Sequence, residues 1–257
     1  MTDSRPLIPV STEGLEALAG ELLKPSTPPS PPGISEVHIL DKTQFWSISG
    51  VPYRNTIETV DLAKNLLDNG NAKTQDDWIL FSRSAKQSGE FYVGDFPLYH
   101  ALFTTLFIMR DHPAKRKEVE EMRSFLKDKF EKYWLTTLTR IIYQPRPQDT
   151  IVHNKAMSDE CRVNVDFIDR DEYVKDSQRP HDYKTLLGTD NLGVINSVYN
   201  WITGKDAYLI RINQRPTTVQ ERVAWFVADS ARAVLGCGRY PSDANPALGV
   251  RVARAKK

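Results

Sequence analysis

The sequence predicts an α+β protein with helices mainly in its first half and antiparallel strands mainly in its second half. Segments with apolar residues at helical spacing dominate up to about residue 134, and short β-branched and aromatic segments dominate after it. Helices and strands that separate along a chain in this way favour an α+β fold, in which the helices cover an antiparallel sheet. The length of 257 residues is sufficient for a large hydrophobic core.

The first 33 residues are predicted to form a helix and a linker that precede the main domain. Leucines at helical spacing in residues 11–24 predict an amphipathic helix with Ser11 as its N-cap. Residues 25–33 contain five prolines, which exclude a helix and a central strand. This segment is interpreted as a stiff spacer rather than as a ligand for a proline-binding module. Residues 34–257 are expected to form one domain.

Local patterns then predict the elements of the first half. Asn55 as N-cap, Glu58 at N3 and Gly70 at the end are typical of a helix over 55–70. Residues 97–111 begin with a proline and are apolar on nearly all sides, so we expect a buried helix there. In chain order, the expected elements are strands 36–40 and 45–49, helix 55–70, strands 78–82 and 89–95, and helices 97–111 and 113–134.

The second half is predicted to be rich in strands, with one helix. Asp190 as N-cap and Gly204 at C′ bound that helix. In chain order, the expected elements are strands 135–144, 149–154 and 162–169, helix 191–205, and strands 207–214, 222–230, 232–241 and 249–254.

Charge and local composition argue against several classes of partner. The chain has 34 Lys and Arg against 33 Asp and Glu, a net charge of +1, which does not indicate the excess of basic residues typical of nucleic-acid-binding proteins. The interleaved charges of residues 114–132 indicate a solvated helix face rather than a basic patch. The most apolar run, residues 101–109, is much shorter than the roughly 20 residues that span a bilayer. No secretory signal is recognisable, so we expect a cytoplasmic or virion-associated protein without membrane insertion.

Residues that could carry chemistry match no established catalytic or metal pattern. The dinucleotide, P-loop and zinc-protease motifs are missing, so no cofactor is expected. Cys237 lies in a strand pattern rather than at a nucleophile turn, which favours a buried structural thiol, and its pairing with Cys161 stays open. Five further candidates have no zinc-like spacing, so no metal is expected: His153, Cys161, Asp166, Asp169 and His181.

The segment Val234–Pro241 has two unlike faces if it forms a strand. One face would carry Leu235, Cys237 and Arg239, and the other Val234, Gly236, Gly238 and Tyr240. A strand face directed at the core would not contain two glycines, because they contribute no packed side chain. The second face is therefore predicted to be exposed or to approach a ligand.

Residues 221–254, ERVAWFVADSARAVLGCGRYPSDANPALGVRVAR, resemble the C-terminal segment of the variable proteins of diversity-generating retroelements, especially those of archaea and archaeal viruses. The matching positions are Val223, Ala224, Phe226, Ala228, Ser230, Arg232, Ala233, Leu235, Cys237, Arg239, Pro241, Ser242, Pro246, Ala247, Leu248, Gly249, Val250 and Arg251.

The resemblance implies a C-type lectin fold and, more distantly, similarity to formylglycine-generating enzymes. It places a variable region at about 223–251 and implies recognition of varying targets, with diversification by adenine-directed mutagenesis. The signature Gly-Gly-Ser-Trp and the paired cysteines of those enzymes are missing, so the chain is expected not to be an enzyme. The implied partner is an unknown protein or cell-surface molecule, and the chain is expected to be a monomer.

The resemblance also divides the segment into ligand-binding and scaffold positions. The implied scaffold includes Arg232, Leu235, Cys237, Arg239, Gly249 and Arg251, of which Arg232 and Arg239 are expected to make buried charge-assisted hydrogen bonds. The implied variable, ligand-binding positions are Val227, Asp229, Ala231, Val234, Gly236, Gly238, Tyr240, Asp243, Ala244, Asn245 and Trp225.

The codons and the aromatic residues of the implied variable positions agree with a diversified binding surface. Adenine replacement converts an Asn codon into any NNY codon, and every implied variable residue except Trp225 can be encoded in this way. Tyr240, with Trp225 if exposed, is expected to be an energetic anchor. The alternatives to recognition are an oxidase of the formylglycine-generating type with a divergent site at Cys237, and a structural surface or virion protein.

Overall fold

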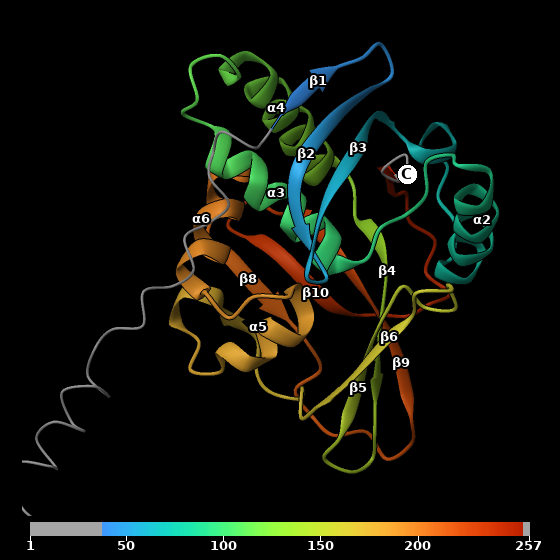
Figure 1. The fold of residues 1–257 in the computed structure, drawn as a ribbon. Helices are drawn as coiled ribbons and strands as arrows, with labels where there is room; N and C mark the ends of the chain where they lie inside the picture. Colours follow the sequence, from blue (N-terminus) through green and yellow to red (C-terminus); the bar gives the residue numbers. More distant parts are fainter. Residues whose placement is uncertain (1–37, 254–257) are drawn as a thin grey trace, which may run out of the picture. The chain divides into compact units, whose positions relative to one another are not determined.

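The structure is a computed structural model that describes residues 38–253, which belong to one compact unit. It shows a mixed α+β fold with two curled sheets and several helices (Figure 1). The predicted helix 11–24 and the proline-rich segment 25–33 lie outside the described residues. Within residues 38–253, no helix combines the length and the apolar composition needed to cross a membrane.

The first sheet is antiparallel and has the strand order β1-β2-β3-β11. Its strands are β1 (Ile39–Asp41), β2 (Phe45–Tyr53), β3 (Thr56–Leu66) and β11 (Leu248–Ala253). The turn residues between β2 and β3, Arg54 and Asn55, have φ angles of 49° and 65°. Two consecutive residues with positive φ are typical of the tight turn of a β-hairpin.

The second sheet has the order β6-β5-β4-β9-β10-β8-β7. Its strands are β4 (Leu135–Tyr143), β5 (Asp149–His153), β6 (Cys161–Val165), β7 (Glu172–Tyr173), β8 (Ala207–Ile210), β9 (Gln220–Ala228) and β10 (Ala233–Arg239). The prediction of strands in the second half is confirmed, although β6 and β8 end earlier than expected. The prediction of an entirely antiparallel sheet is wrong in one place, because β10 and β8 run parallel. Helix α6 (Leu192–Thr203) stands between β7 and β8 in the chain, and α6 contacts both β8 and β10.

Helices occur in both halves of the chain, so their expected concentration in the first half holds only in part. The first half contains α2 (Gln75–Ser88), α3 (Phe96–Met109) and α4 (Arg116–Lys132), and the second half contains α5 (Pro180–Leu187) and α6. Short 3-10 helices occur at η2 (Leu67–Gly70) and η3 (Val174–Asp176). The buried helix at 97–111 is confirmed as α3, whose N-cap Asp95 accepts a 2.9 Å hydrogen bond from the backbone of Leu98.

An aromatic cluster connects the helices to both sheets. The ring of Phe226, on β9, lies 4.3 Å from Phe96 and 5.8 Å from Phe103, both on α3. It also lies 5.4 Å from Phe130 on α4 and 6.1 Å from Tyr199 on α6, measured between ring centroids. Because α3 also contacts β2, this helix joins the core of the second sheet to the first sheet.

Three expected elements of the first half are wrong. Residues 55–70 form strand β3 and a 3-10 turn rather than a helix, since the tight turn at Arg54 and Asn55 returns the chain along β2. Residues 78–82 lie inside α2, which begins at the N-cap Thr74 and ends at Gly89 with a φ of 76°. Residues 89–95 form no regular strand and make one isolated bridge between Tyr92 and Val250.

Helix α5 was not predicted, although its boundaries carry ordinary signals. Pro180 occupies the first helical position, and Gly188 ends the helix with a φ of 85°. The N-cap of α6 is Asn191 rather than Asp190, and Gly204 ends that helix as expected.

The buried His100 on α3 makes stability dependent on pH. Its ring stacks on Tyr199, and burial lowers the pKa of His100 to about 4. As the pH falls, His100 is protonated near pH 6.5 in the unfolded chain but only near pH 4 in the folded chain. The contribution of the neutral, buried His100 to the free energy of unfolding is therefore present above pH 6.5 and is lost as the pH falls toward 4. From pH 7 to pH 5 we expect the free energy of unfolding to fall by about 2 kcal/mol on this account.

Urea unfolding at pH 7 and pH 5 measures this loss. His100→Phe, which retains a ring beside Tyr199, is expected to lose less stability over the same interval. An equal loss in both proteins would assign the pH dependence to other groups, among them His153, whose pKa burial also lowers.

Candidate functional site

Strands β9 and β10 carry the predicted variable segment, and their two faces have different surroundings. In the antiparallel register, Val234 lies opposite Val227 and Gly236 lies opposite Trp225. Phe226, on the other face of β9, belongs to the main core, as do Leu235 and Cys237 of β10. Trp225, Val227 and Val234 instead form a separate small cluster. The predicted alternation along β10 is therefore present from Val234 to Cys237. It is wrong for Arg239, which was placed with Leu235 and Cys237 but lies over the ring of Trp134, because the register of β10 shifts between Gly236 and Arg239.

The glycine at position 236 leaves room for an indole ring. A Cβ atom on Gly236 would lie 2.0 Å from Cε2 of Trp225, a separation that a real Cβ cannot adopt. Trp134, the residue immediately before β4, stacks on Trp225 with 4.7 Å between centroids and 7° between planes. The guanidinium of Arg239 lies 3.7 Å from the Trp134 ring centroid. We call this surface the outer face, defined by Trp134, Trp225, Val227, Val234 and Gly236.

The expectation that this side of β10 is open to solvent or ligand is wrong for part of it. Val234 and Gly236 are buried, and so are Trp225 and Val227 on β9. The reason is that the Trp225 side chain fills the space over Gly236 and packs with the two valines. Trp134, which is 44% exposed, supplies the accessible aromatic surface there.

A turn between β9 and β10 holds the next two predicted variable residues. The Asp229 carboxylate accepts hydrogen bonds from the backbone N–H groups of Ala231 at 2.8 Å and Arg232 at 2.7 Å. It also pairs with the Arg232 guanidinium at 2.8 Å. Arg232 is about one-third exposed, so the expected buried hydrogen bond of this residue is wrong. The pair closes the turn at the surface, and Ala231 is exposed.

The loop at the other end of β10 holds the remaining predicted variable residues. Tyr240 is 56% exposed, and the Arg222 guanidinium lies 3.8 Å from its ring centroid. Ala244 is exposed, whereas Gly238 and Asp243 are half-buried. Nothing lies within 4 Å of a Cβ placed on Gly238, so a side chain has room there.

Asn245 differs from the other loop residues because it is part of the framework. It is buried, and its backbone carbonyl accepts a 2.7 Å hydrogen bond from the Trp78 indole of α2. Its side-chain oxygen accepts a hydrogen bond from the half-buried Arg239. A role of Asn245 as a direct ligand contact therefore conflicts with its burial.

The other scaffold positions have clear packing roles. Leu235 and Cys237 are buried in the main core. A Cβ on Gly249 would lie 2.8 Å from a methyl carbon of Leu67, so this glycine permits close approach of β11. Arg251 pairs with the buried Asp61 on β3 at 2.7 Å and so fixes the register of β11.

The two cysteines are not bonded to each other. Cys161 is exposed and Cys237 is buried, and burial raises the pKa of the Cys237 thiol. No group of three or more His, Cys, Asp or Glu side chains in residues 38–253 is arranged to hold a metal ion. His153 instead hydrogen-bonds to the hydroxyl of Thr139 and the carbonyl of Thr185.

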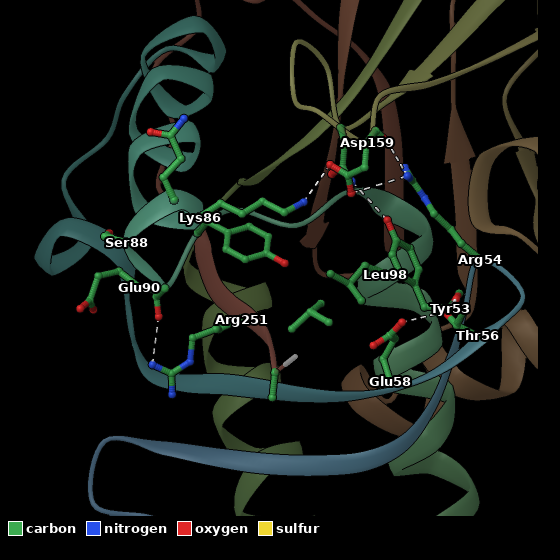
Figure 2. Close-up of a pocket in the computed structure, with 16 residues that line it drawn as sticks. Tyr53, Arg54, Thr56, Glu58, Lys86, Ser88, Glu90, Leu98, Asp159 and Arg251 are labelled. Carbon is green, nitrogen blue, oxygen red and sulfur yellow. Dashed lines mark hydrogen bonds and ion pairs between the residues drawn. The ribbon is translucent and has the colours of Figure 1, made fainter. Parts of the chain in front are cut away.

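A polar pocket of about 670 Å³ lies apart from the outer face, beside the β2–β3 turn and the end of β11 (Figure 2). The Asp159 carboxylate accepts from Lys86 at 2.8 Å and from the Asn154 amide at 2.9 Å. Arg54 bridges Asp159 to Asp95, a buried carboxylate that it approaches at 2.9 Å. These residues were not singled out in the sequence, because they come from four separate segments whose meeting no local pattern encodes.

Comparison with known proteins identifies no relative. No family model matches the chain, and the searches of curated proteins and of solved structures found no match.

Proposed function

We propose that this chain is a ligand-recognition protein with a C-type lectin fold, whose binding surface a retroelement diversifies. The surface comprises the outer face and the turn and loop at the two ends of β10. One observation carries the proposal: alternate residues of β9 and β10 separate into a main core and a second, independent cluster. Positions on the second side can change while Phe226, Leu235 and Cys237 keep the core intact.

The size and chemistry of this surface suit a macromolecular target. The seven residues of β10 extend over about 23 Å, which is comparable to the width of an ordinary protein–protein interface. Exposed aromatic rings stand at both parts of the surface, with Trp134 over the strands and Tyr240 in the loop. Aromatic side chains with fixed rings are frequent energetic anchors, and an arginine holds each of these two.

Burial of Cys237 favours recognition over the oxidase alternative. The catalytic cysteine of such an oxidase has to be accessible to the substrate and to react as a thiolate. Cys237 is fully enclosed, and burial raises the pKa of its thiol. The third alternative, a structural surface or virion protein, does not require the residues of the outer face to vary or to bind a ligand. The DNA sequence around the gene distinguishes this alternative from recognition.

The DNA around the gene tests the retroelement directly. The proposal requires a nearby reverse transcriptase gene and a near-copy of the codons for residues 223–251, differing at adenines of the copy. Those adenines should fall at codons such as 229, 231, 240, 243 and 244. A gene without such a copy contradicts diversification and favours the structural reading.

Tyr240→Ala tests whether the loop is a tolerant surface. Because Tyr240 is exposed, we expect the free energy of unfolding to change by less than about 1 kcal/mol.

A display library with NNY codons at Asp229, Ala231, Tyr240, Asp243 and Ala244 should remain folded and yield binders to an immobilised protein such as lysozyme. The same codons at Phe226, Leu235 and Cys237 should leave only a small fraction of the library folded, with apolar residues at these positions. Unfolding of the first library would contradict the assignment of these positions.

A further inference from the structure

A second pocket, of about 290 Å³, lies between α3, the end of α5 and the start of α6, beside the end of β2. Helix α3 contacts both other helices, and a Cβ on Gly188 would lie 3.8 Å from Pro97 of α3. All of its lining residues precede the segment 223–251. We call it the helix pocket, and its apolar lining includes Pro52, Pro97, Ala101, Leu187 and Val194.

The volume and the lining of the helix pocket suit one small uncharged ring. Pockets for small molecules are mostly apolar and begin at roughly 300 Å³, and cavities of about 150 Å³ already hold a benzene ring. The charged residue of the lining, Arg54, is paired with Asp95 at 2.9 Å and with Asp159 at 3.6 Å. A charged ligand would therefore compete with ion pairs that already exist.

Two polar side chains on successive turns of α3, His100 and Thr104, line the helix pocket. His100 is 3% exposed, and its Nδ1 atom has no hydrogen-bond partner among residues 38–253. Its Nε2 atom lies 3.4 Å from the Thr104 hydroxyl, which is longer than an ordinary hydrogen bond. Because buried polar groups are normally hydrogen-bonded at shorter range, this pair has capacity for a further partner.

The protonation state of His100 indicates which polar group fits. Burial lowers the pKa of His100 to about 4, so the imidazole is neutral at pH 7. A neutral imidazole has one donor and one acceptor nitrogen, and the Thr104 hydroxyl can donate and accept. A ligand hydroxyl also does both, so it matches either orientation of the pair. A carboxylate only accepts, and it would lack a cationic partner because Arg54 is already paired.

We propose that the helix pocket binds a neutral single-ring molecule with a hydroxyl group, of the phenol class. The ring packs between Ala101 of α3 and Val194 of α6, and the hydroxyl hydrogen-bonds to the pair of His100 and Thr104. This site is separate from the outer face and does not depend on diversification there. Variants that differ only in the segment 223–251 would all retain it.

Titration of phenol into the full-length protein, with NMR of labelled leucine and valine methyl groups, tests the proposal. We expect the methyl signals of Leu187 and Val194 to shift, because a bound aromatic ring lies beside them. Ala101→Phe places a ring in the helix pocket and should abolish these shifts.

Toluene, which has the same ring without the hydroxyl, separates the polar contact from filling of the pocket. Thr104→Val should weaken phenol binding about threefold or more, as the loss of one hydrogen bond predicts, and leave toluene binding unchanged. His100→Phe should weaken phenol binding in the same way. Thr105→Val is the matched control, because the Thr105 hydroxyl donates to the carbonyl of Ala101 at 2.9 Å and does not line the pocket.

Three results would overturn the proposal. The first is the absence of shifts at Leu187 and Val194 at millimolar phenol. The second is phenol binding that persists in Ala101→Phe, because the probe then lies elsewhere. The third is an equal loss of phenol and toluene binding in Thr104→Val, because the hydroxyl then makes no specific contact. None of these results bears on diversification, which the DNA around the gene tests.

Discussion

Replacing Arg211 with methionine is expected to lower the free energy of unfolding by about 3–5 kcal/mol. The Arg211 side chain is fully buried, and it pairs with Asp182 at 2.6 Å and Glu172 at 2.9 Å. Asp182 is itself 3% exposed, and burial raises its pKa despite the opposing effect of Arg179 and Arg211. Without Arg211, the folded protein retains a buried carboxylate with one half-exposed cationic partner, Arg179.

Urea unfolding at pH 7, monitored by circular dichroism, measures this loss. Lys132→Met is the matched control, because its ion pair with Asp128 is exposed and screened by solvent, so its loss should change the free energy of unfolding little. The deficit of Arg211→Met should diminish at low pH, where protonation of Asp182 removes the unpaired charge. A cost similar to that of Lys132→Met would show that Asp182 is adequately compensated by Arg179.

The second large effect is expected from Gly236→Val, at about 1–3 kcal/mol of lost stability. The new side chain would occupy the space of the Trp225 ring, which lies within 2.0 Å of the Cβ position. Trp225 cannot simply tilt outward, because Trp134 stacks on it. Tryptophan fluorescence should therefore shift together with the denaturant midpoint.

A double-mutant cycle isolates the steric cause. In the Trp225→Ala background, Gly236→Val should cost much less or become stabilising, because the valine fills the vacated space. If Gly236→Val costs the same with and without Trp225, the loss arises from the backbone of β10 rather than from the indole. Gly238→Val is a useful comparison, since nothing lies within 4 Å of its Cβ position.

This pair restricts which sequences the proposed diversification can use. Trp225 and Gly236 face each other in the β9–β10 ladder, so a large residue is accommodated at one of the two positions only. Functional variants should therefore show a small residue at 225 wherever 236 is large. The turn and loop positions, such as Ala231 and Ala244, carry no such restriction because they are exposed.

Sequence periodicity predicted the second half of the fold better than the first. Strands β4, β5, β9 and β10 have dense β-branched and aromatic composition, and their sequences gave the right element type. The helix predicted over residues 55–70 is wrong because Asn55 and Glu58 have the spacing of a helix N-terminus. Asn55 instead adopts the positive φ of a hairpin turn. The apolar cluster at 78–82 resembles a strand, but its helix is specified by caps outside the cluster, at Thr74 and Gly89.

The candidate site was predictable along one strand but not across strands. Alternation along β10 separated Leu235 and Cys237 from Val234 and Gly236 correctly. It could not reveal that Trp225 covers Gly236, because that contact depends on the register of β9 against β10. Trp134 was missed for the same reason, since it enters the outer face from a distant part of the chain.

The first sheet is complete only when its C-terminal strand, β11, has paired with β3. Arg251 pairs with Asp61 across 190 residues of sequence, and β11 is the last strand of the first sheet. During synthesis, the exposed side of β3 stays without this neighbour until the codons for residues 223–251 have all been read in frame. Long-range pairing of this kind forms late. A chain truncated before β11 would thus leave β3 without its neighbour and the buried Asp61 without its Arg251 partner.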